Sequence, residues 1–215
     1  MFVLGPDHVY RARAFAAFDW LEHGFGTRLS PAFGAGDDVA MLKQVHSPVC
    51  VRASGGGCQG EGDALVASAA GRPVGVRTAD CLPILMAEAR GRAVAAVHAG
   101  WRGTLEGVAA NAAAMLGSAG DIHAAIGPGI GQCCFEVGRE VAERFAGIFP
   151  ERADLGRRTA IDLVEANRRQ LIRAGVPADQ IYAAGLCTVC GSEFHSFRRD
   201  RERAGRMISL IVRLA

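Results

Sequence analysis

Three short apolar segments follow one another in the middle of the sequence, and turn residues separate them. They are VGVRTA (74–79), LPILMA (82–87) and AVAAVH (93–98). Apolar runs of this length that are bounded by turn residues are typical of buried strands. Arg90-Gly91-Arg92 marks a hairpin between the second segment and the third. The middle of the chain is therefore predicted to form part of a buried sheet.

Helical periodicity alternates with further apolar runs in the second half of the sequence. Between residues 103 and 116, apolar side chains recur at steps of three and four residues, which predicts an amphipathic helix. The first forty residues, which are rich in turn chemistry, predict short strands and loops. Further helices are expected at 137–146 and at 161–174, the latter with Thr159 or Asp162 as N-cap, and further strands at 122–127, 180–185 and 207–213.

The alternation of strands and helices predicts an α/β (α+β) fold. The 215 residues contain no internal repeat, no low-complexity segment and no obvious linker. A single domain spanning residues 1–215 is therefore expected, with two half-domains that share one core as the alternative. The 28 glycines predict many tight turns, because glycine is needed where the backbone takes a positive φ.

Charge and hydropathy exclude several classes of partner. The chain carries 24 basic and 22 acidic side chains, so its net charge of +2 gives no electrostatic reason to expect a nucleic acid or an acidic membrane. No basic leader precedes an apolar segment near Met1, and no stretch approaches the roughly 18 apolar residues of a membrane span. A cytoplasmic protein is expected on these grounds.

The cysteines do not have the spacing of a disulfide framework. Seven is an odd number, and the seven include a vicinal pair, Cys133 and Cys134, and one C-x-x-C, Cys187-Thr-Val-Cys190. Free thiols or metal ligands are expected before disulfides. Because no second C-x-x-C occurs in the sequence, a structural zinc knuckle is not expected. Cys187 and Cys190 are interpreted as two small, buried residues at a strand end, with redox chemistry as the alternative.

His46, Cys81 and His98 each lie where an apolar segment meets a polar turn. Strand ends can hold side chains that converge on a cleft, and one thiolate with two imidazoles makes a three-ligand zinc site with an open fourth position. The spacings of 35 and 17 residues do not decide the matter. The alternative is one hydrogen-bonded histidine, one buried thiol and one surface histidine.

Arginines in turn-rich contexts are candidates for binding an anion. Arg28, Arg102 and the pair Arg198-Arg199 offer the bidentate donors that suit phosphate or carboxylate, although each could equally be solvated or salt-bridged. The glycine-rich loop at 127–134 could bind an anion through its backbone N–H groups, but it matches no nucleotide-binding motif. The remaining arginines of the C-terminal run are interpreted as a solvated loop, with an anion site as the alternative.

Six motifs, taken together and in order, resemble a known family. They are KQVHSPV, GDALVA, TADCLPILMA, AAVHAGWRGT, AIGPGIGQCCFEVG and FHSFRRDRERAGRMISL. The sequence is similar to the YfiH/laccase-domain (FAMIN-like) family of purine nucleoside phosphorylases, formerly described as polyphenol oxidases. The resemblance covers roughly residues 24–212, which is nearly the whole chain.

The resemblance implies a zinc-binding catalytic cluster, which by motif falls on His46, Cys81 and His98. It also implies a fold of mixed β-sheets sandwiched between helices. The implied reactions are phosphorolysis of adenosine, inosine, guanosine and 5′-methylthioadenosine, with adenosine deamination as a further activity. A purine nucleoside and phosphate are therefore the expected partners.

Two departures from the family pattern concern the substrate surface. The segment between Arg28 and Lys43 is shorter here than is usual in the family, so part of that surface is expected to be trimmed. Phe135 and Phe197 stand where the family often has tyrosine, which keeps the aromatic ring but removes a hydroxyl.

Phosphorolysis requires an anion site beside the ribose and help for the departing purine. We expect Arg28, with Arg102 or Arg198, to hold phosphate against C1′ of the ribose. Asp80 is a candidate for the carboxylate that moves protons in deamination, the alternative being that it only caps a turn.

Three other functions are weighed against this one. A copper polyphenol oxidase would need many imidazoles, and the chain has only six histidines. A cysteine hydrolase or amidase would use Cys81 as nucleophile and His98 as base, and metal content separates it from the phosphorylase. A non-enzymatic role in cell-wall editing has no supporting peptide-binding signature.

Overall fold

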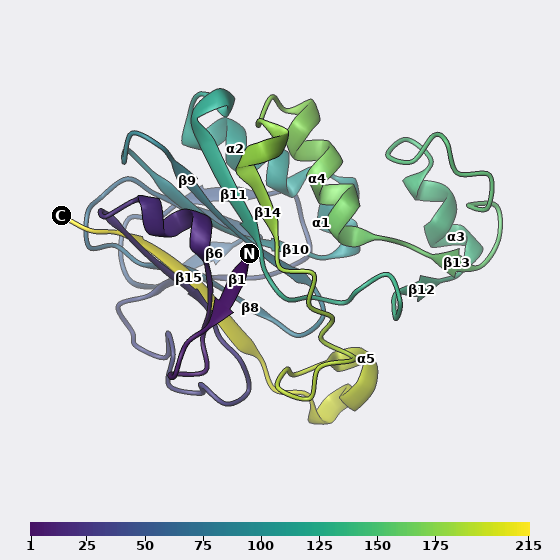
Figure 1. Cartoon of the computed structure of the whole chain (residues 1–215), viewed down its shortest axis with the longest axis horizontal. Coiled ribbons are helices and arrows are strands. Elements are labelled where there is room, and N and C mark those ends of the chain that lie inside the picture. The colour runs from purple at the N-terminus through teal and green to yellow at the C-terminus, as the bar shows by residue number, and fades with distance from the viewer.

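The computed structural model describes all 215 residues and contains two large mixed sheets with five α-helices (Figure 1). The seven-stranded sheet has the order β1 (Phe2–Leu4), β2 (Tyr10–Ala12), β3 (Leu21–Phe25), β15 (Met207–Arg213), β8 (Val74–Thr78), β4 (Ala40–Lys43) and β6 (Gly57–Glu61). The six-stranded sheet has the order β14 (Ile181–Ala183), β11 (Ile122–Ile126), β9 (Leu82–Glu88), β10 (Val94–Ala99), β7 (Ala64–Ala67) and β5 (Cys50–Arg52). A small two-stranded antiparallel sheet pairs β12 (Glu136–Val137) with β13 (Thr159–Ala160).

The helices are short. The α-helices are α1 (Trp101–Leu105), α2 (Val108–Leu116), α3 (Arg139–Ala142), α4 (Leu163–Arg173) and α5 (Phe197–Asp200). Single 3₁₀ turns are η1 (Arg13–Ala17), η2 (Ala119–Asp121), η3 (Glu143–Phe145), η4 (Ala178–Gln180) and η5 (Arg201–Arg203). Three of the α-helices, α1, α2 and α4, lie together over the six-stranded sheet at the top of Figure 1, whereas α3 and α5 lie outside this layer.

The six-stranded sheet is buried on both faces, and the alternation along β9 shows how. Leu82, Ile84 and Met86 belong to the core that this sheet forms with the helices, whereas Leu85 and Ala87 belong to the core that it forms with the seven-stranded sheet. Side chains of a strand alternate between its two faces, so a continuous apolar run serves both cores. The result is three layers, which are helices, one sheet and a second sheet.

The sequence-based prediction of the fold class is confirmed, and most of the predicted strands and helices are found. The three central segments form β8, β9 and β10, and β9 and β10 pair antiparallel across the turn at Gly91. The prediction of one continuous helix over residues 103–116 is wrong. This segment is divided into α1 and α2 because Gly107 takes a φ of 78°, a left-handed conformation that ends the first helix.

Asp162 is the N-cap of α4, which confirms one of the two N-cap residues that the sequence predicted. Its carboxylate accepts a hydrogen bond from the backbone N–H of Glu165 at 2.9 Å. Farther along α4, the buried amide of Asn167 donates to the hydroxyl of Thr104 at 2.9 Å. This bond ties α4 to α1, the helix that follows directly after β10.

The predicted helix at 137–146 is wrong in its extent, because only α3 and the turn η3 form there. These elements, with β12 and β13, make an excursion at one end of the molecule (right in Figure 1). None of the helices is long and apolar enough to cross a membrane.

His23 on β3 gives the fold a dependence on acid pH. Its Nε2 atom accepts a hydrogen bond from the backbone N–H of Ala12 at 2.8 Å, and its ring packs 4.9 Å from that of Phe15. Burial, together with the positive charge of Arg11, lowers the pKa of His23 from 6.5 to about 4. The folded state therefore disfavours the imidazolium form that the unfolded chain accepts.

We expect the free energy of unfolding to be undiminished above pH 6.5 and to fall as the pH drops from 6.5 to 4, by on the order of 3 kcal/mol from His23 alone. In the variant His23→Gln, whose amide can still accept from Ala12, this part of the slope should disappear. Urea unfolding at a series of pH values measures it. His8→Asn, which alters an exposed histidine, should keep the wild-type slope, and an unchanged slope in His23→Gln would contradict the prediction.

Candidate active site

His46, Cys81 and His98 come together at one end of the two sheets. His46 follows β4, Cys81 lies in the turn between β8 and β9, and His98 is on β10. One ligand atom from each residue lies within 4.8 Å of the others, and Cys81 Sγ is 3.9 Å from His46 Nε2. The rings of the two histidines meet edge to face, with centroids 4.9 Å apart. The structure thus brings together all three residues of the predicted cluster.

The topology of the strands explains this convergence. β4 and β8 are neighbours in the seven-stranded sheet, whereas β9 and β10 are neighbours in the six-stranded sheet. The turn at Cys81 carries the chain from one sheet to the other. Beyond the end of β4, the side-chain amide of Gln44 replaces a strand partner, because it exchanges two 2.8 Å hydrogen bonds with the backbone of Arg77. The cluster therefore lies at the junction of the two sheets.

Asp63 is the buried carboxylate that organises the cluster. Its Oδ1 atom accepts a 2.7 Å hydrogen bond from His98 Nδ1 and a 3.0 Å hydrogen bond from the backbone N–H of His46. Its Oδ2 atom accepts from the backbone N–H of Val45 and from both the backbone and the hydroxyl of Ser47. Asp63 therefore fixes the tautomer of His98, whose Nε2 faces the cluster, and the turn that carries His46.

The charges of these groups depend on one another. Burial raises the pKa of Asp63, but hydrogen bonds from His98 and Ser47 outweigh it and lower the pKa to about 2. Burial lowers the pKa of His98, but its bonds to Asp63 and Cys81 raise it to about 9. Burial also raises the pKa of the Cys81 thiol, whereas hydrogen bonds from both histidines bring it down to about 6. Near neutral pH the site therefore favours a Cys81 thiolate beside a His98 imidazolium, and a metal ion that binds there would displace the proton of the imidazolium.

Backbone strain is concentrated at the same place. His46 has a φ of 62° and Asp80 has a φ of 88°. Residues other than glycine rarely adopt this left-handed backbone conformation. Asp80 is held by two hydrogen bonds, one from the Thr188 hydroxyl at 2.7 Å and one from the backbone N–H of Arg198 at 2.6 Å. Both carboxylate oxygens of Asp80 thus connect the Cys81 turn to the segment that leads into α5.

A cavity of about 610 Å³ opens onto the cluster. Aromatic and aliphatic side chains form part of its wall, and cationic side chains form another part. The apolar contributors include Trp101, Phe135, Leu163 and Phe197. The cationic contributors are Lys43, Arg77, Arg198 and Arg206.

The predicted anion-binding arginines are not gathered in one place. Arg198 lines the cavity, where its guanidinium donates to the backbone oxygen of Cys134 at 3.1 Å. Arg102 does not line the cavity but lies 4.5 Å from the ring centroid of Trp101, which does. Arg28 is exposed and outside the cavity, with its guanidinium 3.4 Å from the backbone oxygen of Ser192.

Three residues of the site were missed in the sequence. Asp63 carried a signal, since it is an acidic residue directly before an apolar strand in the motif GDALVA. Arg77 lies within a buried strand, where a single charge also stands out, and Arg206 was interpreted as part of a solvated loop. Neither arginine has a carboxylate within salt-bridge distance, although both line the cavity.

The interpretation of Cys187 and Cys190 as two buried residues at a strand end is wrong. Cys190 is exposed and Cys187 is only half-buried. Their neighbours are Cys133 and Cys134, the vicinal pair that the sequence places more than fifty residues earlier. The absence of a second C-x-x-C does not prevent a group of four cysteines, because the second pair comes from a different loop.

The donor set of His46, Cys81 and His98 fits a metal ion. One thiolate and two imidazoles are ligands that zinc takes, and the hydrogen bond from His98 to Asp63 is the second interaction typical of a metal-bound histidine. Three protein ligands leave one position for a substrate or water. A carboxylate, a thiol and imidazoles in a cavity of this size can support metal-assisted chemistry on a small molecule.

Comparisons with known proteins identify the family to which this chain is similar. The family model described as multi-copper polyphenol oxidoreductase laccase matches residues 26–214. A purine nucleoside phosphorylase of Deinococcus radiodurans is 39% identical over 191 residues, which cover 86% of this chain and 74% of that protein. The adenosine deaminase RL5, from an unknown prokaryotic organism, is 41% identical over 162 residues, which cover 70% of this chain and 62% of that protein.

The same fold occurs in a solved structure. The crystal structure of YlmD from Geobacillus stearothermophilus superposes with a TM-score of 0.87 at 27% sequence identity. The superposition covers 100% of this chain and 99% of that one. The whole three-layer arrangement is therefore shared, including the excursion that carries α3.

Gly100 provides a test of the cluster that leaves its ligands unchanged. A Cβ atom at this position would lie 2.9 Å from His46 Cδ2 and 3.0 Å from Cys81 Sγ. Both atoms belong to side chains that can move, so we expect Gly100→Ala to displace ligands rather than to unfold the protein. Zinc affinity, measured by competition with a chromogenic chelator, should fall about tenfold or more.

Gly156→Ala is the matched control, because a Cβ there meets no atom within 4 Å. Its zinc affinity should equal that of the wild type, and the melting temperatures of both variants should lie close to it. Equal zinc affinity in Gly100→Ala and the wild type would show that His46 and Cys81 do not share a metal.

Proposed function

This chain belongs to the family described as multi-copper polyphenol oxidoreductase laccase, several of whose relatives are named purine nucleoside phosphorylase, and from that premise we propose that it is a purine nucleoside phosphorylase. The observation that carries the proposal is the composition of one cavity. It combines the His46, Cys81 and His98 cluster with arginines that have no carboxylate partner.

Phosphorolysis joins a phosphate oxygen to C1′ of the ribose and breaks the bond from C1′ to the purine nitrogen. The purine leaves with the electron pair of that bond and must gain a proton. The protein therefore has to bind an anion next to the sugar, hold the base, and favour charge on the departing purine.

Phosphate is assigned to Arg77, Arg198 and Arg206. These guanidinium groups line the cavity and none of them forms a salt bridge with a carboxylate, so an anionic substrate would supply the missing ionic partner. Lys43 is less available, because it forms an exposed ion pair with Glu61 at 2.8 Å. Asp80 acts as a positioning residue, since its carboxylate holds the backbone of Arg198.

The purine is assigned to the apolar wall. Phe135 is buried and Phe197 is partly exposed at the cavity, and a flat aromatic base can stack on such rings. Adenosine, inosine, guanosine and 5′-methylthioadenosine all present this kind of surface. A wall built from aromatic rings rather than from hydrogen-bonding groups suits several purine bases. This supports the proposal that the protein accepts several purine nucleosides as substrates.

Zinc is assigned to His46, Cys81 and His98. When bound there, it supplies a Lewis acid next to the substrate and, for adenosine deamination as a further activity, an activated water. Asp63 keeps His98 in the tautomer that presents Nε2 to the ion.

Copper oxidase chemistry is less well supported, although the family description names it. The four remaining histidines lie outside the cavity. His23 and His123 belong to an aromatic group around Phe15 and Phe18, on the far side of the sheets from α4. No second group of imidazoles is available for a multicopper cluster.

A cysteine hydrolase is the second candidate, and one observation favours it. His98 lies between Cys81 and Asp63, so the three side chains form a thiol, imidazole and carboxylate series. In this alternative Cys81 would attack a carbonyl or amidine carbon, and His98 would move the proton. Zinc bound to the same residues excludes that role.

The decisive assay is the release of free purine from adenosine and inosine by zinc-loaded protein, with and without phosphate. We expect release that requires phosphate and forms ribose 1-phosphate. Cys81→Ala should lower the rate by at least about a hundredfold, because it removes a metal ligand. Cys58→Ser, which changes an exposed thiol on β6, should keep the wild-type rate.

Release without phosphate would contradict phosphorolysis. Activity that persists after removal of all metal, but is lost on alkylation of Cys81, would favour the hydrolase. Liquid chromatography with mass detection of both the base and the sugar product distinguishes these outcomes.

Arg206 and Arg28 provide a matched pair for the phosphate site, since both are exposed and neither has a carboxylate partner. We expect Arg206→Ala to raise the KM for phosphate about tenfold or more, with little change in the KM for the nucleoside. Arg28→Ala, outside the cavity, should leave both values near the wild type. Steady-state kinetics with phosphate as the varied substrate measure the difference. A larger increase of the phosphate KM in Arg28→Ala than in Arg206→Ala would assign phosphate binding to Arg28 instead.

A further inference from the structure

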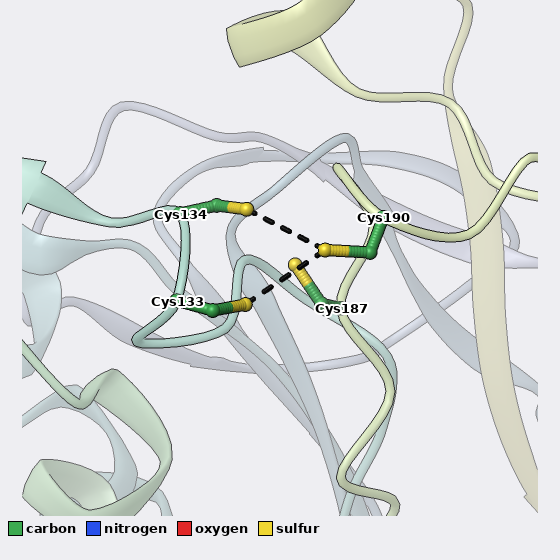
Figure 2. Close-up of side chains that lie close together, drawn as sticks. All are labelled: Cys133, Cys134, Cys187 and Cys190. Atoms are coloured by element: carbon green, nitrogen blue, oxygen red, sulfur yellow. Dashed lines mark hydrogen bonds between the residues drawn. The ribbon is translucent and has the colours of Figure 1, made fainter.

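Four cysteines form a second cluster, outside the His46, Cys81 and His98 site (Figure 2). Cys133 and Cys134 lie in the loop that follows β11, and Cys187 and Cys190 lie in the loop that follows β14. β11 and β14 are parallel neighbours, so the two loops that follow their carboxyl ends begin at the same end of the sheet. Gly129 and Cys187 continue this pairing as an isolated parallel bridge.

The four sulfurs have the spacing of ligands around one ion. All four lie within 4.8 Å of one another, and Cys190 Sγ is 3.5 Å from Cys134 Sγ and 3.8 Å from Cys133 Sγ. In a tetrahedral zinc site with zinc–sulfur bonds of about 2.3 Å, neighbouring sulfurs are about 3.8 Å apart. The two distances from Cys190 Sγ therefore lie close to those of sulfurs that share one zinc ion.

The arrangement does not favour disulfide pairs. A disulfide requires the two sulfurs to approach to about 2.05 Å, with one partner for each. Here Cys190 lies at similar distances from both members of the vicinal pair, and all seven cysteines of the chain are free. One sulfur with two equivalent neighbours is typical of a common ligand sphere.

Hydrogen-bond donors of the surrounding chain reach the cluster and its two loops. The backbone N–H of Gly131 donates to Cys187 Sγ at 3.3 Å, a contact that stabilises a negative sulfur. The guanidinium groups of Arg198 and Arg199 donate to backbone oxygens of the same two loops, Arg198 to that of Cys134 and Arg199 to that of Val189. These bonds fix the backbone of both loops next to the four sulfurs.

We propose that Cys133, Cys134, Cys187 and Cys190 bind a zinc ion that clamps the two loops together. The clamp has a structural role, since four protein ligands leave no open position. It adjoins the cavity, because Phe135 follows Cys134 directly and Thr188 lies within the other loop. The Thr188 hydroxyl donates to Asp80 at 2.7 Å, so the zinc would hold both the aromatic wall and the support of Arg198.

The test counts zinc in a chain that lacks the first site. His46→Ala/Cys81→Ala protein, loaded with zinc and dialysed, should retain one equivalent, and adding Cys187→Ser should remove it. Adding Cys58→Ser instead should leave one equivalent bound. The result does not depend on catalysis, so failure of the phosphorylase assay would leave this proposal standing.

Cobalt provides a second measurement on the wild-type chain. Full loading should give two equivalents, with the intense sulfur-to-cobalt charge-transfer band of a four-cysteine site retained in Cys81→Ala and lost in Cys190→Ser. Removing the metal with a chelator should lower the melting temperature, and zinc should restore it. These readouts apply even where one cysteine variant fails to fold.

Two outcomes would overturn the proposal. In the first, the His46→Ala/Cys81→Ala protein binds no zinc, and thiol titration under denaturing conditions finds two free thiols instead of the six that remain after Cys81→Ala, one of the seven cysteines having been replaced. That result would assign the cluster to disulfides. In the second, no zinc binds although every thiol is free and the chain is folded, and the cysteines would then hold no ion.

Discussion

The buried carboxylate of Asp63 is the interaction on which the site depends. It accepts hydrogen bonds from three consecutive backbone N–H groups, from the Ser47 hydroxyl and from His98. A buried charge is stable only when it is fully hydrogen-bonded, so the turn and the histidine must adopt one arrangement to satisfy it. The strained backbone of His46 is compensated by these bonds, because the left-handed conformation is what directs three N–H groups to one carboxylate.

The two sheets give this network its position. The six-stranded sheet is buried on both faces and therefore rigid, and the seven-stranded sheet meets it where the Cys81 turn passes between them. Each ligand of the first cluster comes from a different strand end, and each thiol pair of the second comes from a different loop. Both clusters thus bring together segments that are distant in the sequence, one at the junction of the two sheets and one at the carboxyl ends of β11 and β14.

The sequence predicted well the features that depend on local pattern. The apolar runs of β9 and β10, the hairpin at Gly91 and the cap at Asp162 each depend on a few adjacent residues. Gly107, which divides one predicted helix, shows the limit of periodicity, since a single left-handed residue interrupts a pattern that remains regular on both sides.

Features that depend on long-range pairing were harder to predict. The motif resemblance identified His46, Cys81 and His98, but spacing alone did not, because the distances between strand ends are set by the topology of the sheets. The same cause explains the cysteine cluster, which becomes visible only when β11 and β14 are known to be parallel neighbours. It also explains why the sequence did not reveal that Arg206 lines the cavity and that Arg28 does not, since turn context does not indicate which arginines face a cavity.

The place of β15 has a consequence for biosynthesis. Residues 207–213 pair with β3 on one side and with β8 on the other, and so join the N-terminal strands to the rest of the seven-stranded sheet. All other strands of both sheets are synthesised earlier, and pairings of such large sequence separation form slowly. While the nascent chain is still emerging from the ribosome, β15 is not yet available to pair with β3 and β8. The backbone edges of these two strands and their apolar side chains are then exposed. This interval is when the protein is most open to aggregation and to capture by a chaperone, and it ends only when residue 213 has left the exit tunnel.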